Sequence, residues 1–453
     1  MMYLSEAATA TQGQVIGEDV LFTSVGTDSR KLVTDQLFIA LRGENFDGHA
    51  YARQSLQEGA AAVMLSAEVE GATPALLVKD TRLALGHLAA HWRSKFKIPL
   101  AAITGSNGKT TVKEMLASIL RMASDQSNVL ATEGNLNNDI GLPLTLLKLR
   151  SQHHYAVAEM GMNHAGEISY LTRIGRPTVA LVNNATSAHL GGLGSVEGVA
   201  RAKGEIFEGL DANGVAVINA DDQFAPLWKE LAAAHQITTF GLEHEADVSA
   251  AYRLQADSSH IQLRTPHGSA EFLLPVAGLH NVRNALAASA VALAMGASMD
   301  AIAMGLGNFG GVKGRLQHKP GLNGALVIDD TYNANPASMK AAIDVLARQE
   351  GERLLVLGDM GELGADAESM HAEVGHYAKQ AGIENLYTLG ELSREMTKAF
   401  GHGAHHYETP EALASVVGRS MGASTVVLVK GSRFMRMERV VALITAENQQ
   451  EEH

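Results

Sequence analysis

The segment from residue 100 to residue 120 reads LAAITGSNGKTTVKEMLASIL, and it decides the fold of the chain. It opens with an apolar run, Leu100–Ile103, of the length of a buried strand, and a glycine-rich loop follows. The remainder has the i, i+3, i+4, i+7, i+8 apolar spacing of one buried helix face, at Val112, Met115, Leu116, Ile119 and Leu120. A strand, a loop and a helix in this order predict an α/β unit whose loop binds phosphate.

The loop from Thr104 to Thr111 has the composition of a phosphate-binding P-loop, although Ile103 occupies the position of the first glycine in the strict motif. Backbone N–H groups of such a loop point at phosphate oxygens, and the helix N-terminus adds positive partial charge. We expect Lys109 to contact the β- and γ-phosphates of ATP while the Thr110 hydroxyl binds Mg²⁺. The alternative is a glycine-rich turn capped by threonine. The predicted ATP-binding residues of this loop are Gly105, Ser106, Asn107, Gly108, Lys109, Thr110 and Thr111.

The alternation of strands and helices continues on both sides of this segment. Apolar runs recur at Tyr155–Ala158, Thr178–Val182 and Val215–Ile218, with helical segments between several of them. Strands that are apolar throughout and alternate with helices predict a parallel sheet covered on both faces. Before Pro99, short strands such as Leu37–Ala40 predict a small mixed α/β unit.

A third series of elements begins near Gly314. The run Ala325–Ile328 predicts a strand, and Asn335 is expected to cap a helix that has Pro336 at its first position. Two more apolar strands, Leu354–Leu357 and Thr425–Val429, complete a Rossmann-like unit. The predicted fold class is therefore α/β, with three domains over residues 1–97, 98–313 and 314–453.

The composition excludes several classes of protein. A chain of 453 residues is too long for one core, and its net charge of −13 argues against a nucleic-acid or membrane-surface role. With no cysteine, it has neither disulfides nor thiolate sites. The N-terminus lacks the pattern of a signal peptide, and no apolar run approaches the ~20 residues of a bilayer span. We expect a cytoplasmic protein.

A series of motifs downstream of the loop indicates a protein family. In chain order they are TEGNLNNDIG (132–141), AEMGMN (158–163), AHL (188–190), AKGE (202–205), GLHNVRN (278–284) and Gly314-Arg315. Together with the loop TGSNGKTT they resemble the central domain of the Mur ligase superfamily. The resemblance extends over nearly the whole chain, and it implies a central P-loop ATPase-like domain at residues 98–313.

The two ends of the chain narrow this resemblance to one branch. The segments DDTYNANPASM (329–339), LGDMGELG (357–364) and VKGSR (429–433) resemble the branch that adds D-alanyl-D-alanine to UDP-N-acetylmuramoyl-tripeptide. The Asp-Asn-Pro-Arg motif expected of the diaminopimelate-adding branch is absent from the sequence. The segments TDSR (27–30), FIALRG (38–43) and FDGH (46–49) resemble the UDP-binding domain of the family.

The resemblance implies an ATP-dependent amide-bond ligase that works through an acyl phosphate and forms ADP and phosphate. It implies two Mg²⁺ ions, with Glu159 and His189 as ligands of the second ion. It also implies that Lys203 is carbamylated, which turns a repelling ammonium into an oxygen ligand. For His189, one of 19 histidines, the alternative is a surface or core histidine whose hydrogen bonds are satisfied by the protein. For Lys203 the alternative is a solvated lysine on a helix. The predicted catalytic residues are Lys109, Glu159, His189 and Lys203.

Further residues are assigned to the nucleotide and the substrates. Asn281 and Asn284 lie three apart, so they share a helix face and can hydrogen-bond a flat heterocycle such as adenine. Asp330 is assigned to the ribose and Arg315 to phosphate. Helix capping and turn chemistry are the competing explanations for these polar residues. The predicted substrate-binding residues are Ser29 and Arg30 for UDP, Thr132, Asn137 and Asn138 for sugar–pyrophosphate or metal-bound water, and Asn333, Asn335, Ser338 and Lys430 for the dipeptide.

Two other functions compete with this prediction. A folylpolyglutamate synthase would share the central motifs, but the asparagine-rich segment 333–339 and the UDP-type N-terminal segments speak against it. A non-catalytic nucleotide switch would explain the P-loop but leaves Glu159, His189 and Lys203 without a purpose. We expect a monomer, and the sequence leaves open whether the tripeptide ends in diaminopimelate or lysine.

Overall fold

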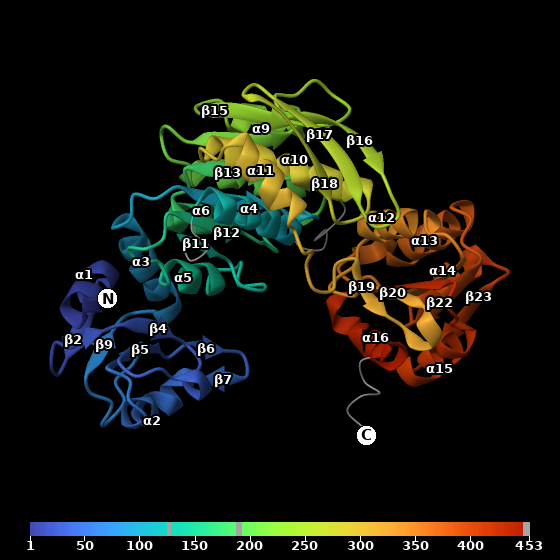
Figure 1. Ribbon diagram of the computed structural model, residues 1–453. Helices are drawn as coiled ribbons and strands as arrows, with labels where there is room; N and C mark the ends of the chain where they lie inside the picture. The colour runs from blue at the N-terminus through green and yellow to red at the C-terminus, as the bar shows by residue number, and fades with distance from the viewer. Residues whose placement is uncertain (125–127, 187–192, 447–453) are drawn as a thin grey trace.

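The computed structural model describes residues 1–124, 128–186 and 193–446. Three α/β units follow one another along the chain and form an arch, with the central unit at the top (Figure 1). Each unit is built on one main sheet, of five strands in the N-terminal unit and six in each of the other two.

The N-terminal sheet has the strand order β2-β9-β8-β5-β4. Its strands β4, β5, β8 and β9 are parallel, and β2 joins the edge in the antiparallel direction. The predicted strand at Leu37–Ala40 is confirmed as β5, one residue earlier than expected. The bounds are β2 Gln14–Ile16, β4 Ser24–Gly26, β5 Gln36–Ile39, β8 Ala62–Leu65 and β9 Ala75–Leu77, with α1 Leu4–Thr11, α2 Ala52–Gln57 and α3 Thr81–Ser94.

The central sheet confirms the predicted parallel sheet covered on both faces. All six strands run parallel in the order β11-β12-β10-β13-β14-β15. Side chains alternate along β10, so Leu100 and Ala102 join one core cluster while Ala101 and Ile103 join the cluster on the opposite face. The strands are β10 Leu100–Thr104, β11 Val129–Ala131, β12 Tyr155–Glu159, β13 Val179–Val182, β14 Val215–Asn219 and β15 Gln236–Phe240.

Helices α4 (Lys109–Ala123) and α10 (Leu279–Ala294) cover one face of this sheet, and α5 (Gly141–Leu146) and α6 (Glu167–Gly175) lie against the other. A second, antiparallel sheet of β16 (Ser249–Leu254), β17 (Ser259–Thr265) and β18 (Gly268–Leu274) was not predicted. Its signal is strict alternation in β17, where Ile261 and Leu263 are buried and their neighbours face outward. Strand β18 packs on α11 (Met299–Gly307).

The C-terminal unit has the predicted Rossmann-like form, with one antiparallel strand, β19, at the edge. Asn335 caps α12 (Pro336–Ala347), as the sequence predicts, and Ser338 completes a reciprocal capping box that was not predicted. The sheet order is β19-β20-β24-β21-β22-β23. The bounds are β19 Gln317–Pro320, β20 Leu326–Asp330, β21 Glu352–Gly358, β22 Asn385–Leu389, β23 Ala404–Tyr407 and β24 Thr425–Lys430, with α13 Ala367–Gln380, α14 Ser393–Phe400, α15 Pro410–Ser420 and α16 Glu438–Ile444.

The cores of the three units are divided unequally. One hydrophobic cluster runs without a break from the N-terminal unit, through Leu85 and Leu88 of α3, to Leu142 and Leu146 of α5 in the central unit. Two further clusters are confined to the C-terminal unit, and a smaller one is confined to the N-terminal unit. Polar contacts cross the first boundary as well, since Trp92 Nε1 donates to the carbonyl of Leu149 at 3.1 Å. The N-terminal and central units therefore share a hydrophobic core, whereas the core of the C-terminal unit is separate.

Across the described stretches of the chain, no helix is both long enough and apolar enough to span a bilayer.

Candidate active site

The predicted phosphate loop lies between β10 and α4, as the sequence indicates. Gly108 has φ 80° and leads directly into the helix, and a Cβ there would come within 2.3 Å of the Asn284 side-chain oxygen. Only glycine therefore fits this position. The Lys109 ammonium donates to the carbonyl of Gly105 at 2.7 Å and so lies back across the loop. Burial lowers the pKa of Lys109.

A buried carboxylate stands beside the start of α4. Glu159 ends β12, next to β10 in the sheet, and it is 3% exposed. Its Oε2 accepts a hydrogen bond from Thr110 Oγ1 at 2.9 Å, and its Oε1 accepts one from Asn137 Nδ2 at 2.8 Å. The backbone N–H of Glu159 donates to Thr132 Oγ1 at 3.0 Å. The structure thus brings four predicted residues into direct contact.

Lys203 lies in the last turn of α8 (Val196–Gly204) and is 1% exposed. The alternative of a solvated helix lysine is therefore wrong. Burial and, to a lesser extent, the nearby Lys109 ammonium hold the pKa of Lys203 well below its usual value. An amine in this environment is neutral at a lower pH than an ordinary lysine. His189, the other predicted ligand, lies outside the described residues.

Two cavities meet at the boundary between the central and C-terminal units. The first, of about 340 Å³, is lined by residues of the phosphate loop and by Glu159 and Lys203, together with residues of the C-terminal unit. The second, of about 410 Å³, holds Asn281 and Asn284. The predicted residues that line both are Asn107, Gly108, Arg315, Asp330, Ser338 and Lys430.

The second cavity has a floor of hydrogen-bonded asparagines. Asn284 Nδ2 donates to Asn281 Oδ1 at 3.3 Å, while its own Oδ1 accepts from Asn183 Nδ2 at 3.3 Å. Asn183 Nδ2 also reaches the carbonyl of Asn107 at 3.0 Å, and Asn184 Oδ1 accepts the N–H of Asn107 at 2.8 Å. Asn183 and Asn184 were not predicted from the sequence, although they directly follow a buried strand, and ligands bind at the carboxyl ends of the strands in a parallel sheet.

His280 is a second residue that sequence analysis missed. It lines the 410 Å³ cavity one position before Asn281. Burial lowers its pKa from 6.5 to about 4, more strongly than the Asp330 carboxylate raises it. The imidazole is therefore neutral at pH 7 and can both donate and accept hydrogen bonds.

Residues of the C-terminal unit reach directly into the phosphate loop. Arg315 Nη2 donates to Thr110 Oγ1 at 3.0 Å, and its guanidinium stacks 4.4 Å from the ring centroid of Tyr332. Asn335 Nδ2 donates to Asn107 Oδ1 at 2.8 Å. The two units therefore touch at the point where the terminal phosphate of a nucleotide is expected.

The four residues assigned to the dipeptide all have partners within the protein. Asn335 and Ser338 form the capping box of α12. Lys430 Nζ donates to Asp330 Oδ2 at 2.6 Å and to the carbonyl of Asn333 at 2.9 Å. Asn333 Oδ1 accepts N–H groups of Ala334 and Arg433. Lys430 and Asp330, which sequence analysis assigned to different ligands, are thus one buried ion pair.

The remaining predicted residues differ in whether they line a cavity, are buried behind the site or are exposed. Asn138 lines the 340 Å³ cavity, but its side-chain oxygen accepts the N–H of Gly141 at 2.9 Å, in agreement with the turn-chemistry alternative. Thr132 is buried behind Glu159. In the N-terminal unit, Arg30 is exposed and pairs with Asp28, and neither Ser29 nor Arg30 lines the two cavities.

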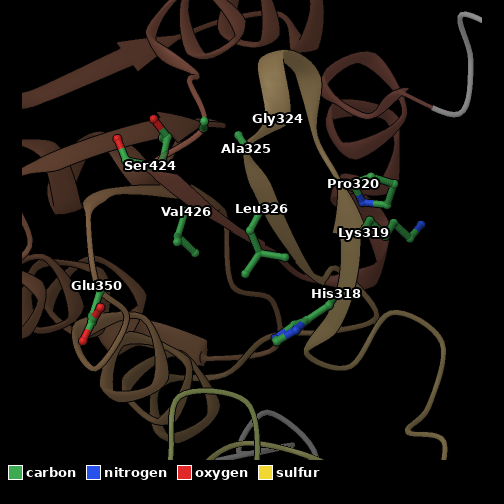
Figure 2. Close-up of a pocket in the computed structure, with 11 residues that line it drawn as sticks. His318, Lys319, Pro320, Gly324, Ala325, Leu326, Glu350, Ser424 and Val426 are labelled. Carbon is green, nitrogen blue, oxygen red and sulfur yellow. The ribbon is translucent and has the colours of Figure 1, made fainter.

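Another cavity, of about 480 Å³, lies at the opposite end of the C-terminal sheet (Figure 2). His318 and Lys319 of β19 line it together with Leu326, the first residue of β20. None of the predicted site residues lines this cavity.

The donor groups beside the phosphate loop suit a hard divalent cation. Thr110 and Glu159 offer a hydroxyl and a carboxylate 2.9 Å apart at the edge of a polar cavity. Mg²⁺ prefers oxygen ligands and is bound through one or two carboxylates together with substrate phosphates. Within the described residues no three His, Cys, Asp or Glu side chains converge, so an all-protein cage is not formed there. The residues present fit a Mg²⁺ ion that binds with a nucleotide.

Comparison with known proteins gives matches over almost the whole chain. Residues 21–93 match the family described as Mur ligase family, catalytic domain, residues 103–292 match the Mur ligase middle domain, and residues 314–433 match the Mur ligase, glutamate ligase domain. The chain is 45% identical to the UDP-N-acetylmuramoyl-tripeptide–D-alanyl-D-alanine ligase of Escherichia coli K12, over 97% of each chain.

Two solved structures are similar as well. The crystal structure of MurF from Acinetobacter baumannii aligns with a TM-score of 0.91 at 39% identity, over 97% of each chain. The MurF ligase from Thermotoga maritima in complex with ADP aligns with a TM-score of 0.85 at 26% identity, over 96% of this chain and 100% of that one.

Proposed function

The chain belongs to the Mur ligase family, and we propose that it joins D-alanyl-D-alanine to UDP-N-acetylmuramoyl-tripeptide in an ATP-dependent reaction. It is an ATP-dependent ligase of peptidoglycan precursor synthesis. One observation carries the proposal for the site. The phosphate-loop Lys109, the carboxylate of Glu159 and the buried Lys203 face one cavity together with Arg315 of the C-terminal unit.

The proposed reaction has two steps. The tripeptide carboxylate attacks the γ-phosphorus of ATP, and the bond to the bridging oxygen breaks to release ADP and leave an acyl phosphate. The free amine of the dipeptide then attacks the acyl carbon, a tetrahedral intermediate forms, and phosphate leaves with the C–O electron pair while the amine loses a proton. Lys109 and Arg315 would stabilise the negative charge on the transferring group.

The first step brings several anionic oxygens together, which requires positive charge at that point. Thr110 and Glu159 would hold a Mg²⁺ ion together with ATP. When bound, Mg²⁺ would supply additional positive charge to the phosphate oxygens. Since Arg315 already donates to Thr110 Oγ1 across the unit boundary, a modest rearrangement of this side chain would place it on phosphate.

We further propose that Lys203 carries a carbamate and that it shares a second Mg²⁺ with Glu159 and His189. Carbamylation requires a neutral amine, and the lowered pKa of Lys203 supports this. The carbamate would turn a buried ammonium into an oxygen ligand that a hard cation prefers.

The proposal includes the assignment of UDP to residues 1–97, of ATP to 98–313 and of the dipeptide to 314–453. A site composed of several units must close before reaction, and closure would exclude water from the acyl phosphate. We also propose that the enzyme acts as a monomer in the cytoplasm, where ATP and the UDP-linked substrate would be available to it.

Phosphate release tests the proposed activity directly. A ligase should release phosphate only when ATP, the UDP-tripeptide and D-alanyl-D-alanine are all present. A nucleotide switch would hydrolyse ATP without either substrate, and this outcome would refute the ligase. The same assay with tripeptides ending in diaminopimelate or in lysine would identify the natural third residue.

A further inference from the structure

A buried lysine next to the phosphate loop has no part in the reaction described above. Lys113 lies one helical turn after Lys109 in α4 and is 1% exposed. Its ammonium donates to the carbonyl of Thr132 at 2.5 Å and pairs with Glu114 Oε1 at 2.6 Å. Lysine is rarely buried to this extent, and a buried ion pair is often no more stable than apolar side chains of the same size. The stability of the fold therefore does not explain well why a lysine occupies this buried position.

The partner of Lys113 is directly connected to the Glu159 carboxylate. Thr132 follows β11, is 1% exposed, and its N–H donates to the carbonyl of Val157 at 3.0 Å. Its hydroxyl accepts the N–H of Glu159 at 3.0 Å. Glu159 in turn accepts the Thr110 hydroxyl at 2.9 Å. A continuous line of contacts thus runs from the Lys113 ammonium through Thr132 to the two groups assigned to Mg²⁺.

We propose that Lys113 is a positioning residue for the metal site. Its ammonium holds the Thr132 carbonyl, which fixes the Thr132 hydroxyl under the Glu159 backbone and orients the Glu159 carboxylate toward Thr110. The inference rests on the proposed function, because it concerns the same Mg²⁺ site. It adds a residue that acts on the metal through Thr132 and touches neither substrate nor metal.

Direct metal binding tests this inference without relying on turnover. Mn²⁺ serves as the probe, and its binding to the full chain in the presence of ADP is measured by electron paramagnetic resonance. Lys113→Met keeps about the length of the aliphatic part of the side chain and removes the ammonium. We expect it to weaken Mn²⁺ binding about 10- to 100-fold, the range found when a group behind a metal ligand is removed. The KM for the UDP-tripeptide should stay unchanged.

Lys148 supplies the matched control. Its ammonium holds the same segment from outside, through Glu133 at 2.7 Å, and its side chain is 47% exposed. Exposed pairs of this kind contribute little. Lys148→Met should therefore bind Mn²⁺ like the wild type.

A second variant keeps the test decisive if Lys113→Met does not fold. Thr132→Val leaves the carbonyl that Lys113 contacts and removes only the hydroxyl under Glu159, so it should weaken Mn²⁺ binding as well. When both single variants fold, the double variant should bind no more weakly than the weaker single, because both changes interrupt one line of contacts.

Wild-type affinity for Mn²⁺ in a folded Lys113→Met or Thr132→Val protein would overturn the role of Lys113 and leave the ligase assignment intact. If the wild-type chain with ADP bound no Mn²⁺, the metal site itself would be wrong, and the role of Lys113 would fall with it.

Discussion

Two lysines, the half-buried Lys109 and the fully buried Lys203, line one cavity, and the Lys109 charge acts on Lys203. Such an arrangement is unfavourable for two ammonium groups, because burial penalises charge and like charges repel. The same arrangement becomes favourable when a triphosphate binds and one of the two amines is neutral. The site is therefore organised for a highly anionic ligand. Substitution of either lysine tests this conclusion.

Lys109→Ala should reduce turnover at least ~10²-fold, because it removes positive charge from the transferring phosphoryl group. Lys398→Ala, which removes a 70% exposed lysine of α14, is the control and should keep the wild-type rate. Steady-state phosphate release measures both. A near-normal rate for folded Lys109→Ala would contradict the phosphate-loop assignment.

Lys203→Ala should lose most activity, and added formate or acetate should restore part of it by supplying a carboxylate in the vacated space. Lys203→Arg should stay inactive, because a guanidinium keeps its charge and is not carbamylated.

The same residue predicts a pH dependence of activity. Since the pKa of Lys203 is lowered, the neutral amine persists to lower pH than in an ordinary lysine, and activity should be lost as pH falls through that lowered pKa. If Lys203→Arg were fully active, the carbamate would be excluded.

His280 predicts a specific pH dependence of stability. Its pKa of about 4 in the folded protein lies below the unfolded value of 6.5. As pH falls from 6.5 to 4 the unfolded chain binds a proton that the folded chain does not, so the free energy of unfolding decreases, by up to about 3 kcal/mol. His280→Leu should lack this decrease. Urea unfolding followed by the fluorescence of Trp92 and Trp228, at pH 7.5 and 4.5, compares the two proteins, and equal pH dependence would contradict the prediction.

At the scale of elements, α12 combines two tasks at its first turn. Asn335 caps the helix through Ser338 N–H and also donates to Asn107 in the phosphate loop, 228 residues away. The first contact stabilises the C-terminal unit, and the second connects it to the nucleotide site.

Substitution can separate these two tasks. Asn335→Ser keeps a capping oxygen but is too short to reach Asn107, so the melting temperature should be preserved while ADP affinity falls about 2- to 10-fold, the effect of one hydrogen bond. Asn335→Ala should lose the cap as well, at a cost of about 1 kcal/mol of stability. Circular dichroism melts and calorimetric ADP titrations distinguish the two variants. Unchanged ADP affinity in Asn335→Ser would show that the contact with Asn107 is irrelevant to nucleotide binding.

At the scale of the whole molecule, the division of the cores decides which parts can fold alone. The C-terminal unit has its own two clusters, so a fragment of residues 314–446 should melt cooperatively. A fragment of residues 1–97 should not, because it keeps only one small cluster of its own, while Leu85 and Leu88 of α3 would lose the central unit against which they pack. Residues 1–313 keep the shared core and serve as the control. A cooperative melt of the fragment 1–97, followed by circular dichroism, would contradict this division.

Features that depend on neighbours along the chain could be predicted from the sequence alone. The strand–loop–helix of β10 and α4, the parallel central strands and the Asn335 cap followed from periodicity and capping chemistry within a few residues. The antiparallel strands β16–β18 escaped prediction because they carry many polar and exposed residues, unlike the apolar runs by which the parallel strands were recognised.

The pairing of polar groups, by contrast, depends on how distant elements pack in the folded protein. Lys430 and Asp330 are 100 residues apart, and their ion pair arises because β20 and β24 are neighbours in the sheet. Lys113 reaches Thr132 because α4 packs beside β11, and Asn183 reaches Asn284 because α10 lies over β13. The residues next to a side chain in the sequence do not show these partners, because the strands of each six-stranded sheet are not in chain order. Whether a polar residue stabilises the fold or meets a ligand is therefore settled by the packing of distant elements.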